Sequence, residues 1–266
     1  MSYISHYMFC SDRQVPARHR LLSLRAWCRQ PLGEALAVAE RQALCEVLGD
    51  IFGYHLVVLD PPCQPEALDA SRILHRVVQT CCQQGLENQT SVQGLAESLP
   101  MQADSVDAFV LPHVLDVSAD PHQVLREIDR CLVAEGHLII VGFNPRGWWG
   151  LHRLLFGWRQ RVPWSLKFVS MPRLRDWLSL LGFDTLQARY IFPHPPWHYG
   201  RERSEGRLLQ RLHHERWPLL AASYLLVARK RVATLTPIKP RWRPRRSLLA
   251  GGGVAETGHG NVSRHV

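Results

Sequence analysis

Short apolar runs that alternate with amphipathic helical segments constrain the fold of this sequence most strongly. Four such runs precede residue 144, at 55–59, 73–78, 106–111 and 137–143. Turn-forming residues bound each run, as is typical of buried strands. Helical periodicity is found over residues 32–52, before the first run, and over residues 121–135, between the third run and the fourth. Strands that alternate with helices indicate crossover connections and a mostly parallel sheet, so the sequence predicts an α/β fold.

The helix expected after residue 120 has recognisable ends. Asp120 followed by Pro121 favours a helix start, because an Asp side chain caps the first amides and proline fits the first helical position. Gly136 is expected to end this helix. Further along, a helix is predicted at 172–181 and two strands at 183–191 and 224–229. Residues 192–216, which are rich in Pro, His and Arg, suggest a lid or a helical insertion.

Positive charge is concentrated in two stretches. The formal net charge is +9, but residues 146–175 hold seven Lys or Arg and residues 229–246 hold eight, with no acid in either stretch. The rest of the chain is therefore mildly acidic. Residues 232–266 have no apolar period, which predicts a disordered basic tail that could bind nucleic acid through its charge.

A series of short motifs follows in a fixed order after residue 98. They are Leu99-Pro100, Ser105-Val106-Asp107 before an apolar strand, LREIDRCL at 125–132, Glu135-Gly136 before the next strand, LRDWLSLLGF at 174–183 and LLVARK at 225–230. This order resembles the class I S-adenosylmethionine-dependent methyltransferases, in particular their type 11 subgroup. The resemblance covers about residues 55–230. It implies a Rossmann-like methyltransferase fold, with a mostly parallel seven-stranded sheet flanked by helices.

The resemblance divides the chain into three parts. Residues 1–53 would form an N-terminal helical extension, residues 54–231 the methyltransferase-like domain, and residues 232–266 the basic tail.

The resemblance also implies S-adenosyl-L-methionine as the cofactor, bound beyond the carboxyl ends of the strands. Its expected contacts are Leu59, Asp60, Pro61, Pro62, Gln79, Thr80, Leu95, Ala96 and Leu111. Asp60 is expected to accept a hydrogen bond from the ammonium group of the cofactor.

Three of these places depart from the family pattern. Asp60-Pro61-Pro62 stands where a glycine-rich loop is usual, and the two prolines remove backbone donors. Gln79 and Thr80 occupy the region of the usual ribose-binding acid, and Leu95 that of an adenine-binding Asp. The sequence therefore predicts micromolar affinity at best, about −8 kcal/mol, or a fold that has lost the activity.

The loop after the first strand also allows a different interpretation, because it reads Asp60-Pro61-Pro62-Cys63. Cytosine-5 RNA methyltransferases carry a Pro-Cys whose thiolate attacks the base, and amino-group methyltransferases carry Asp-Pro-Pro followed by an aromatic residue. Both motifs follow the fourth strand in those enzymes, whereas this one follows the first. The strand-and-turn interpretation is therefore favoured.

Candidate catalytic and substrate residues follow the fourth and fifth strands. A neutral His113 could take a proton from a hydroxyl or amine acceptor, and the alternative is a histidine that packs within its loop. Asn144 follows the fifth strand. The run from 147 to 158 holds Trp148 and Trp149 beside several arginines. It could cap an apolar substrate, dock on an anionic membrane surface, or pack on the edge of the sheet.

Composition argues against a membrane-spanning, a secreted and a metal-binding protein. No apolar run approaches the ~18 residues of a membrane span, and the N-terminus lacks the pattern of a signal peptide. The seven cysteines show no CxxC pair, so we expect reduced thiols, no metal site and a cytoplasmic protein.

Three functions remain open. The first is a methyltransferase acting on a small or apolar molecule, and the second is a non-catalytic binding or scaffold protein of the same fold. The third is a nucleic-acid binder that works through the basic tail at 232–266. The oligomeric state is left open.

Overall fold

The computed structural model describes residues 14–63, 66–82, 90–156, 162–192 and 221–232. The expected lid or insertion at 192–216 and the basic tail at 232–266 lie almost wholly outside this part of the chain. Among the described residues, no helix combines the length and the apolar character that crossing a membrane requires.

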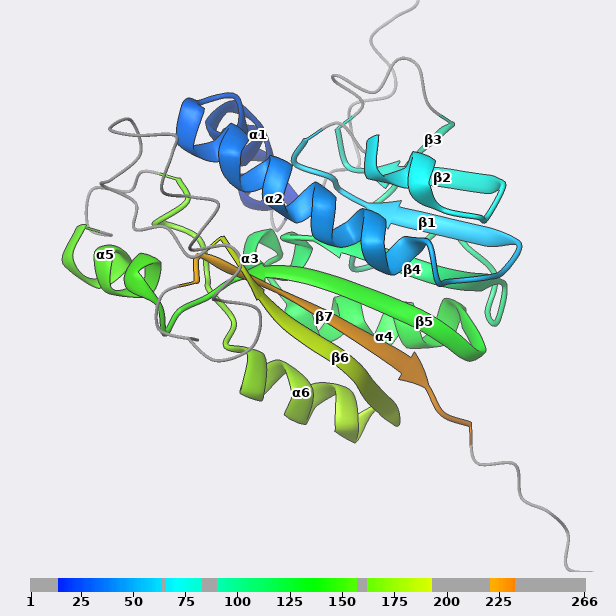
Figure 1. Cartoon of the computed structure of the whole chain (residues 1–266). Helices are drawn as coiled ribbons and strands as arrows, with labels where there is room; N and C mark the ends of the chain where they lie inside the picture. The colour runs from blue at the N-terminus through cyan, green and yellow to red at the C-terminus, as the bar shows by residue number, and fades with distance from the viewer. Residues whose placement is uncertain (1–13, 64–65, 83–89, 157–161, 193–220, 233–266) are drawn as a thin grey trace, which may run out of the picture. The chain divides into compact units, whose positions relative to one another are not determined.

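A seven-stranded sheet forms the centre of the described chain (Figure 1). Its strands are β1 (His55–Leu59), β2 (His75–Thr80), β3 (Ser91–Gln93), β4 (Val106–Pro112), β5 (Leu132–Phe143), β6 (Phe183–Ile191) and β7 (Ser223–Lys230). They lie in the order β3-β2-β1-β4-β5-β7-β6. The pairs among the first five strands are parallel, and β7 runs antiparallel to both of its neighbours. The prediction of a mostly parallel seven-stranded α/β sheet is confirmed.

The helices cover both faces of this sheet (Figure 1). They are α1 (Gln14–Cys28), α2 (Pro31–Leu48), the short 3₁₀ helix η1 (Glu66–Ala70), α3 (Val114–Val117), α4 (Pro121–Cys131), α5 (Trp148–Phe156) and α6 (Met171–Leu180). One core lies between the sheet and α1, α2 and η1, and the other between the sheet and α4 and α6.

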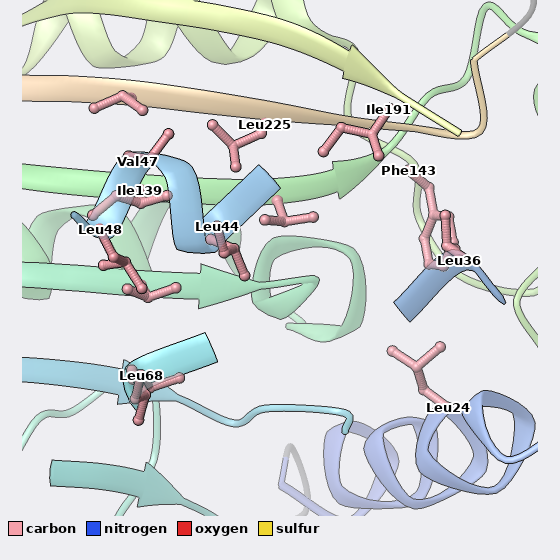
Figure 2. Close-up of a cluster of buried hydrophobic side chains, with 14 of the residues drawn as sticks. Leu24, Leu36, Leu44, Val47, Leu48, Leu68, Ile139, Phe143, Ile191 and Leu225 are labelled. Carbon is pink, nitrogen blue, oxygen red and sulfur yellow. The ribbon is translucent and has the colours of Figure 1, made fainter. Parts of the chain in front are cut away.

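The N-terminal helices pack closely against the sheet. Figure 2 shows Leu44 and Val47 of α2 in the same buried cluster as Ile139 of β5 and Leu225 of β7. Gly33 lies where the two helices meet, and a Cβ there would clash with the Trp27 carbonyl oxygen. Only glycine therefore permits this close corner between α1 and α2. The corner sets the direction of α1 relative to α2.

The structure corrects two boundaries. Ile73 was expected to begin the second strand, but β2 covers His75–Thr80 and thus contains Gln79 and Thr80. Helix α4 does begin at an Asp120 cap, whose Oδ1 accepts from the amides of His122 and Gln123. It ends at Cys131, however, and Gly136 lies inside β5. Leu132 adopts extended geometry and pairs with Val106, so the chain enters the sheet earlier than its glycine suggests.

Candidate functional site

The predicted cofactor residues meet at one edge of the sheet. Strand β1 pairs with β2 through Leu59 and Gln79, and with β4 through Val58 and Val110. Because these strands are parallel, the segments that follow them emerge side by side. Leu59, Thr80 and Leu111 are buried there, as are Pro61, Pro62 and Ala96.

Asp60 connects the segments that follow β1 and β2. Its Oδ1 accepts from the Cys81 amide at 2.7 Å, and its own amide donates to the Gln79 carbonyl. Its φ of 41° lies in the left-handed region, which a non-glycine residue adopts only when its surroundings hold it there. Burial raises the pKa of the Asp60 carboxyl, against the opposing effects of the Cys81 amide, Thr80 and the charge of Arg25.

Gln79 presents a buried acceptor at the same edge. Its Nε2 donates to the Leu95 carbonyl at 2.9 Å, which places the segment around Leu95 beside β2. Its Oε1 has no hydrogen-bond partner within the described part of the chain. A buried acceptor without a partner costs free energy, so a ligand hydroxyl that donated to it would bind favourably.

Helix α1 covers this edge. A cavity of about 20 Å³ remains beneath it, lined by Ala17 and Leu21 of α1 and by Asp60, Cys81 and Val114 among others. Pockets for small ligands usually measure about 300–1,000 Å³. A molecule as large as a nucleoside therefore enters only if α1 moves.

The loop after β1 lacks the usual anion-binding geometry. Pro61 and Pro62 have no amide hydrogen, and the chain continues into the five-residue helix η1. A longer helix starting here would direct several free amides and the positive end of its dipole at a ligand. Binding at this edge must depend on side chains.

His113 lies at the end of β4, in the left-handed region with φ 58°. Its Nδ1 is 3.0 Å from Asp116 Oδ2 and its Nε2 is 3.1 Å from both carboxylate oxygens of Glu40 in α2. Burial alone would lower the pKa of His113, but the charge of Glu40 and hydrogen bonds to both carboxylates raise it to about 10. The ring also stacks on Phe143.

These contacts determine whether His113 can act as the expected base. Both ring nitrogens of His113 donate to carboxylates, and the side chain is 2% exposed. A protonated imidazole cannot accept a proton, so a base role would require Glu40 to move away first. In the described conformation His113 instead holds the end of β4 to α2.

Cys63 follows β1, not β4, as the favoured strand-and-turn interpretation requires. Its thiol hydrogen-bonds with that of Cys28 at the end of α1, and this bond lowers the pKa of Cys63. The charges of His113 and Arg25 act in the same direction.

The three expected substrate residues lie in different environments. Asn144 is buried, donates to the Ala221 carbonyl and accepts from the Arg146 amide. Trp149 is 0% exposed, within an aromatic cluster that includes Trp27. Trp148 is exposed. The structure therefore supports the packing interpretation for Trp149, whereas the neighbouring Trp148 presents an exposed ring.

A larger cleft lies between α1 and α5. Its volume is about 940 Å³, and its lining includes His19 and Arg20 of α1, Arg153 and Leu154 of α5, and Trp164. No acidic side chain is among the described lining residues. Basic and apolar groups together suit a ligand with an apolar body and a negative charge.

Sequence reasoning placed residues 1–53 in a helical extension, but it did not identify α1 as part of the site, nor the arginines of α1, nor Glu40. The apolar spacing of Leu21, Leu24 and Trp27 indicates a helix here, and all three side chains are buried. The contact between Glu40 and His113 joins residues 73 positions apart, and no local pattern announces it.

Comparison with known proteins agrees with this architecture. The family model of a methyltransferase domain matches residues 53–140. YafS of Escherichia coli (strain K12) is 34% identical over 215 residues, which cover 80% of this chain and 84% of YafS.

Solved structures match over most of their length. A SAM-dependent methyltransferase from Thermotoga maritima superposes with a TM-score of 0.55 and 17% identity, covering 82% of this chain and 97% of that one. The [4+2]-cyclase SpnF superposes with a TM-score of 0.51 and 17% identity, covering 83% and 96%. At these identities the structural matches establish the fold alone.

Proposed function

The chain belongs to the class I S-adenosylmethionine-dependent methyltransferase family, and we propose that it transfers the methyl group of this cofactor to a small or apolar acceptor. The observation that carries the proposal is the meeting of Asp60, Gln79 and Ala96 at one edge of the sheet, beneath α1. When bound, S-adenosylmethionine supplies an electrophilic methyl group on a sulfonium.

The polar groups at this edge fit the cofactor chemically. The Asp60 carboxylate can accept from the ammonium group, directly or through water. Gln79 Oε1, which is buried without a partner, can accept from a ribose hydroxyl. Leu95 and Ala96 offer an apolar surface to the adenine ring. The space fits only after α1 has moved, because the cavity measures about 20 Å³.

The acceptor would bind in the cleft between α1 and α5. A volume of about 940 Å³ suits a small molecule, and Trp164 and Leu154 would contact its apolar body. His19, Arg20 and Arg153 would attract a negative group on the acceptor. Methyl transfer depends mainly on holding the two reactants in line, so the chief contribution of these residues would be positioning. His113 as a base stays a prediction.

Titration calorimetry on the full chain tests the proposal. We expect S-adenosylmethionine and S-adenosylhomocysteine to bind one site with micromolar dissociation constants. Asp60→Ala should weaken both by more than tenfold, since a lost charged hydrogen bond costs about 1.5–3 kcal/mol. Absence of heat and of any thermal stabilisation at millimolar ligand would refute cofactor binding.

A second candidate function is non-catalytic binding within the same fold. The prolines after β1 and the short η1 helix favour it, because they remove the amides that usually hold the cofactor. The cyclase SpnF shares the fold and is not named for methyl transfer. Nucleic-acid binding through residues 232–266 remains a further proposal. Such binding would weaken steeply as salt rises, whereas small-molecule binding at the edge of the sheet beneath α1 would change little.

A further inference from the structure

Helix α1 places a positively charged side chain, Arg25, at the edge of the sheet where the predicted cofactor residues meet. Leu21 and Leu24 anchor the helix in the core, with 2% and 0% exposure, and Arg25 follows on the side that faces the segments after β1 and β2. Its guanidinium donates to the Pro61 carbonyl at 3.2 Å, the Thr80 hydroxyl at 3.1 Å and the Cys82 carbonyl at 3.0 Å. The side chain therefore lies between the two segments that Asp60 connects.

The position of Arg25 suits the carboxylate of the cofactor, which the loop after β1 is poorly equipped to bind. The amino-acid part of the cofactor carries an ammonium and a carboxylate. Asp60 can serve only the ammonium, because a carboxylate repels another carboxylate. The loop offers few amide donors for the negative group, since Pro61 and Pro62 have none. A guanidinium is suited to a carboxylate, because its planar fork donates two parallel hydrogen bonds.

We propose that Arg25 binds the carboxylate of the amino-acid part of the cofactor, and that α1 is a lid which carries this residue. The inference rests on the proposed function and extends it to the chain's own N-terminal helix. The small cavity under α1 requires the helix to open for entry, and Arg25 then exchanges carbonyl and hydroxyl partners for the ligand. A carboxylate is the stronger partner, so a bound ligand favours a position of α1 in which Arg25 contacts it. That position is displaced from the described one, because the described cavity is too small for the ligand.

Two ligands separate this role from a purely structural one. S-adenosylhomocysteine has the amino-acid part, whereas 5′-methylthioadenosine lacks it and keeps the nucleoside. Both are titrated by calorimetry into the full chain and its variants. We expect Arg25→Met to weaken S-adenosylhomocysteine by about 10–150-fold, the range of a lost charged hydrogen bond, and to change 5′-methylthioadenosine less than twofold.

Arg20→Met is the matched control. Arg20 also lies on α1 and donates to the Val117 carbonyl at 3.2 Å, so its loss loosens the lid without removing the cation at the cofactor edge. It should change both affinities by the same factor. Arg25→Lys, which keeps the charge but not the fork, should lose less affinity than Arg25→Met, and melting curves verify that each variant is folded.

The outcomes are distinct. Equal losses for the two ligands in Arg25→Met would show that Arg25 only supports the helix, and a gain for both would show that it blocks the site. Either result overturns the proposal. If the wild-type chain binds 5′-methylthioadenosine but not S-adenosylhomocysteine, the carboxylate role is likewise refuted. Binding of neither ligand to the wild-type chain would refute the proposed function itself.

Discussion

Replacing Glu40 by Gln should destabilise the protein far more than its position on the N-terminal helix α2 suggests. Glu40 is 8% exposed, and both of its carboxylate oxygens lie 3.1 Å from Nε2 of the buried His113. The substitution removes the negative charge that faces the buried imidazolium and leaves a neutral amide oxygen as the acceptor for Nε2. Breaking a buried ion pair from one side costs about 3–5 kcal/mol, and we expect a loss in this range at pH 7.

The pH dependence gives a second readout. The pKa of His113 is raised from 6.5 to about 10, so its contribution to stability is complete below pH 6.5 and is lost as the pH rises through about 10. A rise of about 3.5 units corresponds to at most about 5 kcal/mol at 1.36 kcal/mol per unit. The free energy of unfolding should therefore fall between pH 7 and pH 10 in the wild-type chain, and fall less steeply in Glu40→Gln.

Glu46→Gln provides the matched control, because Glu46 lies on the same helix and pairs with Arg189. That pair is partly exposed, and surface pairs contribute up to about 1 kcal/mol. Urea denaturation of the three proteins at several pH values measures all of these quantities. Equal losses in Glu40→Gln and Glu46→Gln, with parallel pH profiles, would refute the buried charge network.

Three further predictions concern stability and the site. Asp60→Asn should melt at the same or a higher temperature, because burial raises the pKa of Asp60 and disfavours its charge, yet calorimetry should show at least tenfold weaker S-adenosylhomocysteine binding; a lower melting temperature with unchanged affinity would contradict this. Trp149→Ala should cost about 3–5 kcal/mol in urea denaturation and Trp148→Ala less than about 1 kcal/mol, and similar losses would disprove the aromatic core. Cys63→Ala should change stability only modestly and leave any methyl transfer, followed with a labelled donor, largely intact; loss of a covalent RNA adduct in this variant would instead support the cytosine mechanism.

Apolar runs located most of the strands. Strand β1 has the predicted bounds, and β4 differs by one residue, because buried parallel strands are nearly continuous in apolar side chains. The boundary between α4 and β5 could not be found in this way. Leu132 continues the apolar spacing of the helix, but it pairs with Val106 in the sheet, and tertiary pairing overrides local periodicity.

The sequence predicted which strand ends form the candidate cofactor site, but not that α1 covers it. Strand order places Asp60, Gln79 and Leu111 together, because parallel neighbours end at the same edge. The placement of α1 over that edge depends on contacts between distant segments, such as Arg25 with the Cys82 carbonyl. Periodicity reveals that α1 is helical, but it does not reveal what the helix covers.

Hydrogen–deuterium exchange with and without S-adenosylhomocysteine tests the central claim most directly, because it locates the ligand without assuming an acceptor. The account predicts slower exchange of the amides at residues 79–82 and 95–97 when the ligand is bound, together with slower exchange in α1 as the helix closes. Unchanged exchange in these three segments at saturating ligand, or protection confined to other parts of the chain, would contradict a cofactor site at the ends of β1, β2 and β4.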